Sequence, residues 1–265
     1  PQALTHLGIN YDVVKEQNPR LIYAHLSGYG QSGPDCDRPG FDNSAFWMRS
    51  GPVLEWLAPG SEPMNPSYGF GDIVSGTDLY SGILAGLIGR ERTGKGTLVT
   101  TSLYGNGIWC NGESLIHVQP QYGRKFKVDR YHPHDPFAKT YLTKDNQYIA
   151  IYGVSFDRSK EKMKKLFDIG DLLSDPRAEN YKTLRETEFI VQIVKRMEEI
   201  FASKTADEWC KIFLAADIAH ERLRDYNEVY KDPQAFANGY LKKVTMGDGN
   251  ITAMPSPPIE FSDYD

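Results

Sequence analysis

Hydrophobic and polar positions along the first part of the chain alternate between helical and strand spacing. Residues 10–17 have the pattern of a short helix closed by Asn18-Pro19, and residues 21–26 form an apolar run typical of a buried strand. Residues 41–51 predict a helix that ends at a glycine. Residues 52–68 contain four prolines and predict a loop. These elements lead into the longest periodic segment of the chain.

That segment, residues 69–104, predicts a long helix followed by a strand. An apolar stripe at i, i+3, i+4, i+7 and i+8 consists of Tyr80, Ile83, Leu84, Leu87 and Ile88. Small residues interleave with the stripe. Because a glycine inside a helix costs about 1 kcal/mol relative to alanine, they suggest that another backbone or a ligand comes very close. Asp72 stands at the expected N-cap, and Gly94-Lys95-Gly96 predicts the helix end before a β-branched strand.

The hydrophobic pattern of the chain becomes irregular after another predicted helix at residues 106–118. Residues 121–136 are polar, aromatic and irregular, and residues 137–152 predict a hairpin that turns at Lys144-Asp145-Asn146. The remaining predicted elements are helices at about 156–167, 185–203 and 205–216, a short helical region at 227–239 and a strand at 241–246. Thr205 and Glu208 open the third of these helices as a capping box. The order of elements predicts an α/β part to about residue 120 and a smaller α+β part after it.

Composition and charge narrow the function classes. The chain has 265 residues, a net charge of −5 and a sequence pI near 5.7, which argues against a nucleic-acid partner. No apolar run reaches the roughly 18 residues of a membrane span. The chain has three widely spaced cysteines, Cys36, Cys110 and Cys210. This odd number and spacing fit neither a disulfide framework nor a zinc site, and they are typical of proteins in a reducing cytoplasm. His132-Pro133-His134-Asp135 could supply metal ligands, but no further cluster supports such a site, so we expect a loop and no metal.

Two glycine motifs resemble nucleotide-binding patterns and are rejected on context. Residues 28–33 read G-x-G-x-x-G after a strand, but they run into Pro34 and further turn-forming residues, whereas the dinucleotide-binding pattern must open a helix. A glycine-rich loop at the carboxyl end of a strand can still form a ligand site in an α/β fold. Residues 89–95 begin like a P-loop, but Gly96 stands where a Ser or Thr must bind magnesium, and the segment joins a helix to a strand instead of a strand to a helix.

Asp72 has two compatible interpretations. Its carboxylate can cap the long helix by accepting backbone N–H bonds. Alternatively, it is an ionised carboxylate in a glycine-lined site, favoured in that form by the helix N-terminus and able to attack an activated acyl carbon. The residue alone does not decide between them.

Several motifs, taken together, resemble the family III CoA-transferases, the group that includes formyl-CoA, carnitine-CoA and 2-hydroxyacyl-CoA transferases. In the first part these are Asn18-Pro19-Arg20-Leu21-Ile22-Tyr23, the loop from Ser27 to Pro34, Arg38-Pro39-Gly40-Phe41-Asp42, Gly71-Asp72 with Gly76, the segment Gly89 to Gly96, and Ser102-Leu103. In the second part they are Tyr141 to Asn146, Trp209 and Asp232-Pro233-Gln234. The resemblance covers nearly the whole chain in consistent order.

The resemblance implies a fold and an assembly. Residues 1–122 would form a partial Rossmann-like large α/β domain, residues 123–240 a small α+β domain, and residues 241–265 a return segment toward the large domain. In the full-length family, two chains interlock as a homodimer. Coenzyme A is a substrate and not a permanently bound cofactor, and the partners are an acyl-CoA and a small carboxylic acid.

The resemblance also implies a mechanism. Asp72 would attack the acyl-CoA thioester to give a mixed anhydride, and CoA thiolate would convert this into an aspartyl-CoA thioester. Gly28, Tyr29, Gly30 and Gln31 would lie beside the acyl group and offer N–H donors to developing oxyanions.

Three further residues match family positions at the site. Phe41 and Asp42 match positions next to it, with packing at a helix N-terminus as the open alternative for both. His6 stands where members often carry an arginine for the CoA phosphates, and a neutral imidazole is a poor phosphate partner.

Two alternatives remain. The family also contains α-methylacyl-CoA racemases, which need a histidine at the position of Phe41, and a phenyl ring cannot move a proton. Relatives are longer at the N-terminus, so the second alternative is a fragment or a truncated, non-catalytic homologue without CoA affinity.

Overall fold

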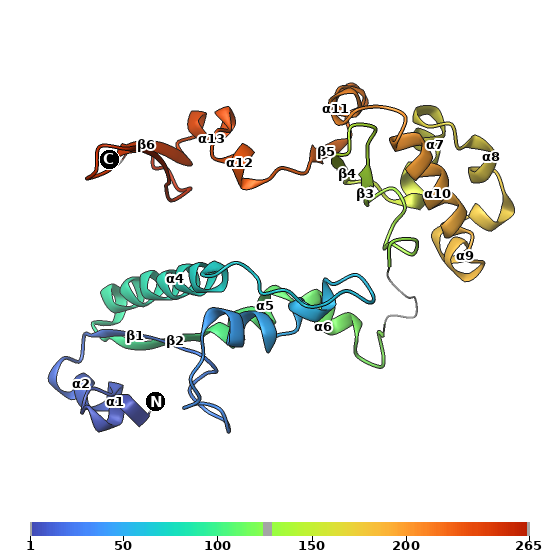
Figure 1. Cartoon of the computed structure of the whole chain (residues 1–265). Helices are drawn as coiled ribbons and strands as arrows, with labels where there is room; N and C mark the ends of the chain where they lie inside the picture. The colour runs from blue at the N-terminus through green and yellow to red at the C-terminus, as the bar shows by residue number, and fades with distance from the viewer. Residues whose placement is uncertain (1, 124–128, 264–265) are drawn as a thin grey trace. The chain divides into compact units, whose positions relative to one another are not determined.

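The computed structural model describes residues 2–123 and 129–263, and the chain forms two compact units, residues 1–127 and 128–265 (Figure 1). The first unit is built on two parallel strands and the second on antiparallel strands. The chain therefore has a mixed α/β fold, as the order of predicted elements indicated.

The long helix α4 (Phe70–Thr93) packs along the parallel strands β1 (Ile22–Ser27) and β2 (Thr97–Ser102) (Figure 1). The two strands pair in register from Ile22–Thr97 to Ser27–Ser102. The contact uses glycines, because a Cβ atom at Gly82 would lie only 2.6 Å from Val99 Cγ1 and one at Gly86 3.2 Å from Ile22 Cγ2. The glycines do allow a close approach, but side chains of the sheet make it, and not the backbone or ligand that the sequence suggested.

The ends and the outer face of α4 also test the sequence predictions. Gly94 closes the helix with a φ of 72°, which confirms the predicted glycine end and the rejection of a P-loop. Tyr80, Leu84 and Ile88 of the predicted apolar stripe are 56%, 41% and 58% exposed. Gly82 and Gly86 therefore face the sheet, whereas these three residues of the stripe do not.

The other elements of the first unit are short. They are α1 (Gln2–His6), α2 (Tyr11–Gln17), the π-helix η1 (Asp42–Met48), α3 (Pro52–Glu55), α5 (Leu103–Cys110) and α6 (Gly112–His117). The predicted helix at 10–17 is confirmed, with Asn10 Oδ1 accepting from Val13 N–H at 3.1 Å. The segment 52–68 was expected to be a loop but contains α3, and the helix expected at 106–118 starts earlier and divides at Asn111.

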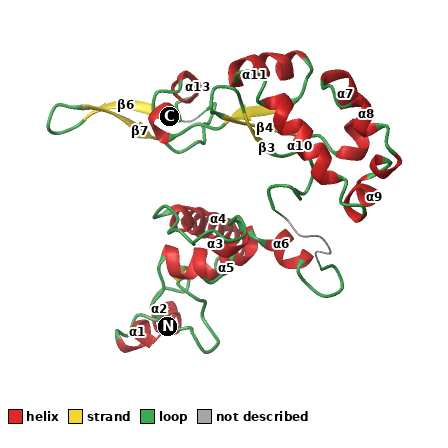
Figure 2. Cartoon of the chain, turned by 45° about the vertical axis from the view of Figure 1, so that its right-hand side comes forward, coloured by secondary structure: helices red, strands yellow, loops and turns green. Residues whose placement is uncertain are grey.

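The second unit holds the larger hydrophobic core of the described residues. Figure 2 shows the helices and strands that surround it. Its sheet has the antiparallel order β3 (Thr140–Leu142), β4 (Tyr148–Tyr152), β5 (Ala219–Arg222). Its remaining elements are α7 (Phe156–Leu166), α8 (Gly170–Leu173), η2 (Pro176–Ala178), α9 (Tyr181–Glu186), α10 (Ile190–Phe201), α11 (Ala206–Ala215), α12 (Tyr226–Val229), α13 (Pro233–Ala237) and the hairpin β6 (Leu241–Thr245) with β7 (Ile251–Pro255).

Aromatic side chains fill this core. The rings of Tyr141 and Phe201 stack at 4.5 Å, and those of Trp209 and Phe213 stack at 5.5 Å. The predicted hairpin and the capping box that opens α11 are confirmed. The prediction of one continuous helix at 185–203 is wrong. Glu188 adopts a φ of 56° and separates α9 from α10.

His132, which the sequence offered as a metal ligand, is held between two carboxylates in the second unit. Its Nδ1 lies 2.9 Å from Asp129 Oδ1 and its Nε2 lies 2.6 Å from Glu188 Oε2. The hydrogen bond with Asp129, followed by that with Glu188, raises the pKa of His132 above its usual value of 6.5. The ring therefore fastens the segment after residue 128 to the junction of α9 and α10.

We expect this arrangement to make stability depend on pH. Because the pKa of folded His132 is raised, its contribution is complete below about pH 6.5 and is lost as the pH rises through the folded value. Urea unfolding at pH 6 and pH 8 should show a loss of up to about 1 kcal/mol in the wild type, which His132→Gln should remove. His220 bonds the carbonyl of Ile218 instead of a carboxylate, so His220→Gln should keep the wild-type pH dependence. Equal pH dependence in the wild type and His132→Gln would contradict this assignment.

Candidate active site

The amino end of α4 places Asp72 differently from the sequence prediction. Gly69, with a φ of 82°, is the N-cap residue, so Asp72 is the third residue of the helix and its assignment as N-cap is wrong. Its side chain is exposed and has no hydrogen-bond or ion-pair partner among residues 2–123 and 129–263. The carboxylate therefore stands free at the positive end of a 24-residue helix.

The cap of α4 comes from Asp42, the first residue of η1. Its Oδ2 accepts the Gly69 N–H at 2.6 Å and its Oδ1 accepts the Gly71 N–H at 2.9 Å. Asp42 is only 5% exposed, and a Cβ atom at Gly71 would lie 2.4 Å from its Oδ1 and 2.3 Å from Phe46 Cγ. Of the two interpretations of Asp42, packing at a helix N-terminus is the contact that the structure shows.

The glycine-rich loop lies where the two parallel strands end. The Tyr104 N–H, just after β2, donates to the Gly28 carbonyl at 3.0 Å. A Cβ atom at Gly28 would lie 2.9 Å from Gly40 Cα, so the start and the end of the loop touch through their backbones. Gly30 has a φ of 105°. No helix begins between Gly28 and Gly40, which confirms the rejection of the dinucleotide-binding pattern.

Cations surround the aromatic ring in this loop. Arg38 and Arg49 lie over the Tyr29 ring at 5.4 and 5.3 Å. Arg49 also pairs with Asp35 at 2.7 Å, and this hydrogen bond raises the pKa of the arginine. Two positive charges thus flank the loop, and one of them is balanced by a carboxylate.

Two other predicted site residues have different surroundings. Gln31 Nε2 lies 2.7 Å from His25 Nδ1, which ties the side chain back to β1. Phe41 is 76% exposed. Gln31 is therefore engaged within the fold, whereas the Phe41 ring is open to a ligand.

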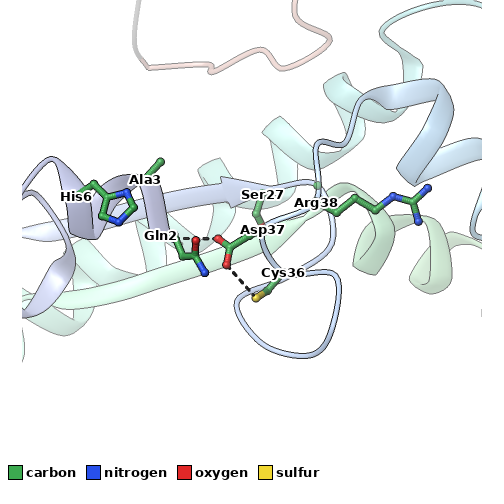
Figure 3. Close-up of a pocket in the computed structure, with 8 residues that line it drawn as sticks. Gln2, Ala3, His6, Ser27, Cys36, Asp37 and Arg38 are labelled. Carbon is green, nitrogen blue, oxygen red and sulfur yellow. Dashed lines mark hydrogen bonds between the residues drawn. The ribbon is translucent and has the colours of Figure 1, made fainter.

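A pocket of about 420 Å³ brings His6 and Gly28 together (Figure 3). Its lining is completed by Gln2, Ala3, Ser27, Cys36, Asp37 and Arg38. The Gln2 N–H donates to Asp37 Oδ1 at 2.9 Å, and this hydrogen bond lowers the pKa of Asp37. In Figure 3 the Arg38 side chain extends away from Asp37. Asp72 is not part of this lining.

Several features of this region were missed from the sequence. Arg38 and Arg49 had no assigned role, although Arg38 directly precedes the Pro39-Gly40 turn and could have been noticed there. An aromatic cluster joins Trp47 to Trp56 at 5.7 Å and to Phe70 at 5.4 Å. The Trp47 ring is buried, whereas Trp56 is 68% exposed.

Within residues 2–123 and 129–263, no group of three or more His, Cys, Asp or Glu side chains is arranged to hold a metal ion. None of the helices described is long and apolar enough to cross a membrane.

Comparison with known proteins assigns the chain to a family. The sequence model of CoA-transferase family III matches residues 1–265, and the chain belongs to that family. It is 34% identical over 260 residues to the (R)-2-hydroxy-4-methylpentanoate CoA-transferase of Clostridioides difficile, which covers 98% of this chain and 64% of the relative. It is 30% identical over 263 residues to the cinnamoyl-CoA:phenyllactate CoA-transferase of Clostridium sporogenes, again across 99% of this chain and 64% of the relative.

Solved structures support the fold. The crystal structure of Rv3272 from M. tuberculosis matches 100% of this chain and 69% of its own chain, with a TM-score of 0.82 and 24% identity. This likeness shows the fold alone. The chain thus spans 64% of the length of the two relatives and 69% of that solved structure.

Proposed function

We propose that this chain carries the nucleophile of a CoA-transferase, which moves coenzyme A from an acyl-CoA to a carboxylic acid. The observation that carries the proposal is the exposed Asp72 carboxylate, unpartnered in the described chain at the start of α4. A carboxylate can act as a nucleophile toward an activated acyl carbon, and this one stands at the positive end of the helix dipole. The family and the two relatives named as CoA-transferases support the same reaction class.

The first half-reaction loads CoA onto the protein. An Asp72 oxygen bonds to the thioester carbonyl carbon of the donor, and the C–S bond breaks to leave a mixed anhydride and CoA thiolate. The thiolate then attacks the Asp72 carbonyl carbon. The donor carboxylate leaves with the bridging oxygen, and Asp72 becomes an aspartyl-CoA thioester.

The second half-reaction runs these steps in reverse with a new acid. The acceptor carboxylate attacks the aspartyl-CoA carbonyl, CoA thiolate leaves, and a second anhydride forms. The thiolate attacks the acceptor acyl carbon, which gives the new acyl-CoA and regenerates Asp72. Each anion that forms replaces one that is consumed, so the exchange needs neither ATP nor an external base.

The pocket at the glycine-rich loop is the proposed place for the polar part of CoA. His6, Arg38 and the backbone around Gly28 line it. Arginine is well suited to phosphate, so we assign the main cationic contact to Arg38, whose guanidinium would turn from the Tyr29 ring toward the pocket, and a lesser one to His6. Tyr29, Gly30 and Phe41 would lie on the acyl side, with N–H groups of the loop available to a developing oxyanion.

The larger arrangement follows the family in this proposal. Residues 1–122 would be the large Rossmann-like domain, 123–240 the small domain and 241–265 the return segment, in an interlocked homodimer in the cytoplasm. The donor is the CoA thioester of a small carboxylic acid, and the acceptor is a second small carboxylic acid in its free form. A racemase is disfavoured because the ring of Phe41 cannot shuttle a proton.

The test is to trap the acyl-enzyme. After incubation with an acyl-CoA, hydroxylamine should convert the activated carboxyl into a hydroxamate on the peptide that contains Asp72, as mass spectrometry would map. Modification at Asp78 on the same helix, or transfer without any modification, would contradict the proposal. Calorimetry with CoA distinguishes the non-catalytic alternative, for which neither CoA binding nor a hydroxamate is expected.

A further inference from the structure

We infer that Asp42 is a positioning residue: it occupies the backbone donor that Asp72 would otherwise bond and so keeps the Asp72 carboxylate free to react. The inference rests on the proposed function of Asp72. It assigns Asp42 a role through α4, and not a contact with substrate.

The argument begins with the position of Asp72 in the helix. A carboxylate at the third helical position can reach back to the N–H of the N-cap residue, as that of Glu does in a capping box. Here the N-cap is Gly69 and the third residue is Asp72. Local preference therefore predicts a hydrogen bond from the Gly69 N–H to Asp72. This bond would tie up a carboxylate oxygen and weaken it as a nucleophile.

Asp42 prevents that bond. Its Oδ2 accepts the same Gly69 N–H at 2.6 Å, while its Oδ1 accepts the Gly71 N–H at 2.9 Å. The acceptor comes from η1, 27 residues away in sequence from Gly69, and is almost fully buried. Because a buried carboxylate needs hydrogen bonds to stay stable, Asp42 holds these donors firmly. The exposed Asp72 competes poorly for them.

Packing fixes Asp42 in this place. The phenyl ring of Phe46, one turn along η1, is 2% exposed and approaches Gly71 so closely that no Cβ atom fits between. The rings of Phe46 and Phe70 pack at 6.3 Å. The start of α4 is thus held by η1 through two hydrogen bonds and the contacts of Phe70 with Phe46 and Trp47, none of which involves Asp72.

A graded series of variants tests the inference in the protein itself. Asp42→Asn keeps a single acceptor oxygen and Asp42→Ala keeps none. The measured quantity is the single-turnover rate of Asp72 acylation at saturating acyl-CoA, per folded molecule. We expect a reduction of roughly tenfold in Asp42→Ala and an intermediate reduction in Asp42→Asn, with CoA affinity unchanged. In a crystal structure of Asp42→Ala, the Asp72 carboxylate should lie within hydrogen-bond distance of the Gly69 N–H.

Asp78 offers a matched control, because its Oδ2 accepts from Thr101 Oγ1 at 3.1 Å and so anchors the same helix away from its amino end. Asp78→Ala should leave the acylation rate per folded molecule unchanged. If Asp42→Ala lowers stability but acylates Asp72 at the wild-type rate, Asp42 is only structural and the inference is wrong. If the wild type itself is never acylated at Asp72, the proposed function fails first, and the inference fails with it.

Discussion

Asp72→Ala is expected to abolish CoA transfer while leaving the fold intact. The side chain is exposed and makes no hydrogen bond with the described residues, and Asp42 supplies the helix cap. Only the favourable interaction of a carboxylate with the helix dipole is lost, so the free energy of unfolding should fall by less than about 1 kcal/mol. Transfer should fall by at least roughly 10³-fold, since no other group replaces a missing nucleophile. Steady-state transfer and urea unfolding of the same preparations measure both quantities.

Asp72→Asn tests the role of the carboxylate more specifically than Asp72→Ala does. The amide has the same shape but cannot form the anhydride, so its activity should be as low as that of Asp72→Ala, with CoA binding retained. Asp78→Asn, which changes a carboxylate two turns along the same helix, should remain active. Retention of more than about a tenth of wild-type transfer in Asp72→Asn would show that Asp72 is not the nucleophile.

The misplaced cap shows what sequence reasoning could reach at this site. An acidic residue in the first turn of a predicted helix is most simply an N-cap, and the pattern around Asp72 carried no sign to the contrary. The true cap lies 27 and 29 residues away from the two N–H groups that it accepts. Such a contact depends on how two segments fold together, which local spacing does not contain. Gly71 leaves room for Asp42 and Phe46, whereas the close approach suggested by the sequence concerned the small residues further along the helix.

The second unit shows the same limit in its secondary structure. The capping box at Thr205 and the turn before β4 are local features and were predicted correctly. The break between α9 and α10 was not, because Glu188 takes a positive φ that its residue type disfavours. Its carboxylate bonds His132, 56 residues away, and this contact was invisible in the sequence. Strand β5 is a short polar segment that carries no apolar run, and its pairing with β4 defines it.

Gly71→Ala is the second variant with a large expected effect. The added methyl group would meet Phe46 Cγ at 2.3 Å and Asp42 Oδ1 at 2.4 Å, and both neighbours are buried. Relief of this overlap must move the cap, the ring or the start of α4. Overpacking together with a weakened cap should lower the free energy of unfolding by roughly 3 kcal/mol. Acylation of Asp72 should also fall in the molecules that remain folded, because the displaced Asp42 releases the Gly69 N–H.

Gly76 provides the matched control on the same helix, since a Cβ atom there has nothing within 4 Å. Gly76→Ala should therefore raise stability by up to about 1 kcal/mol through helix propensity alone. Urea unfolding and single-turnover acylation of the two variants, made by the same chemical change five residues apart, separate the effect of the methyl group from that of its surroundings. If Gly71→Ala were as stable as Gly76→Ala, the contact of η1 with the start of α4 would not be as close as described. The positioning of Asp72 through Asp42 would then lose its structural basis.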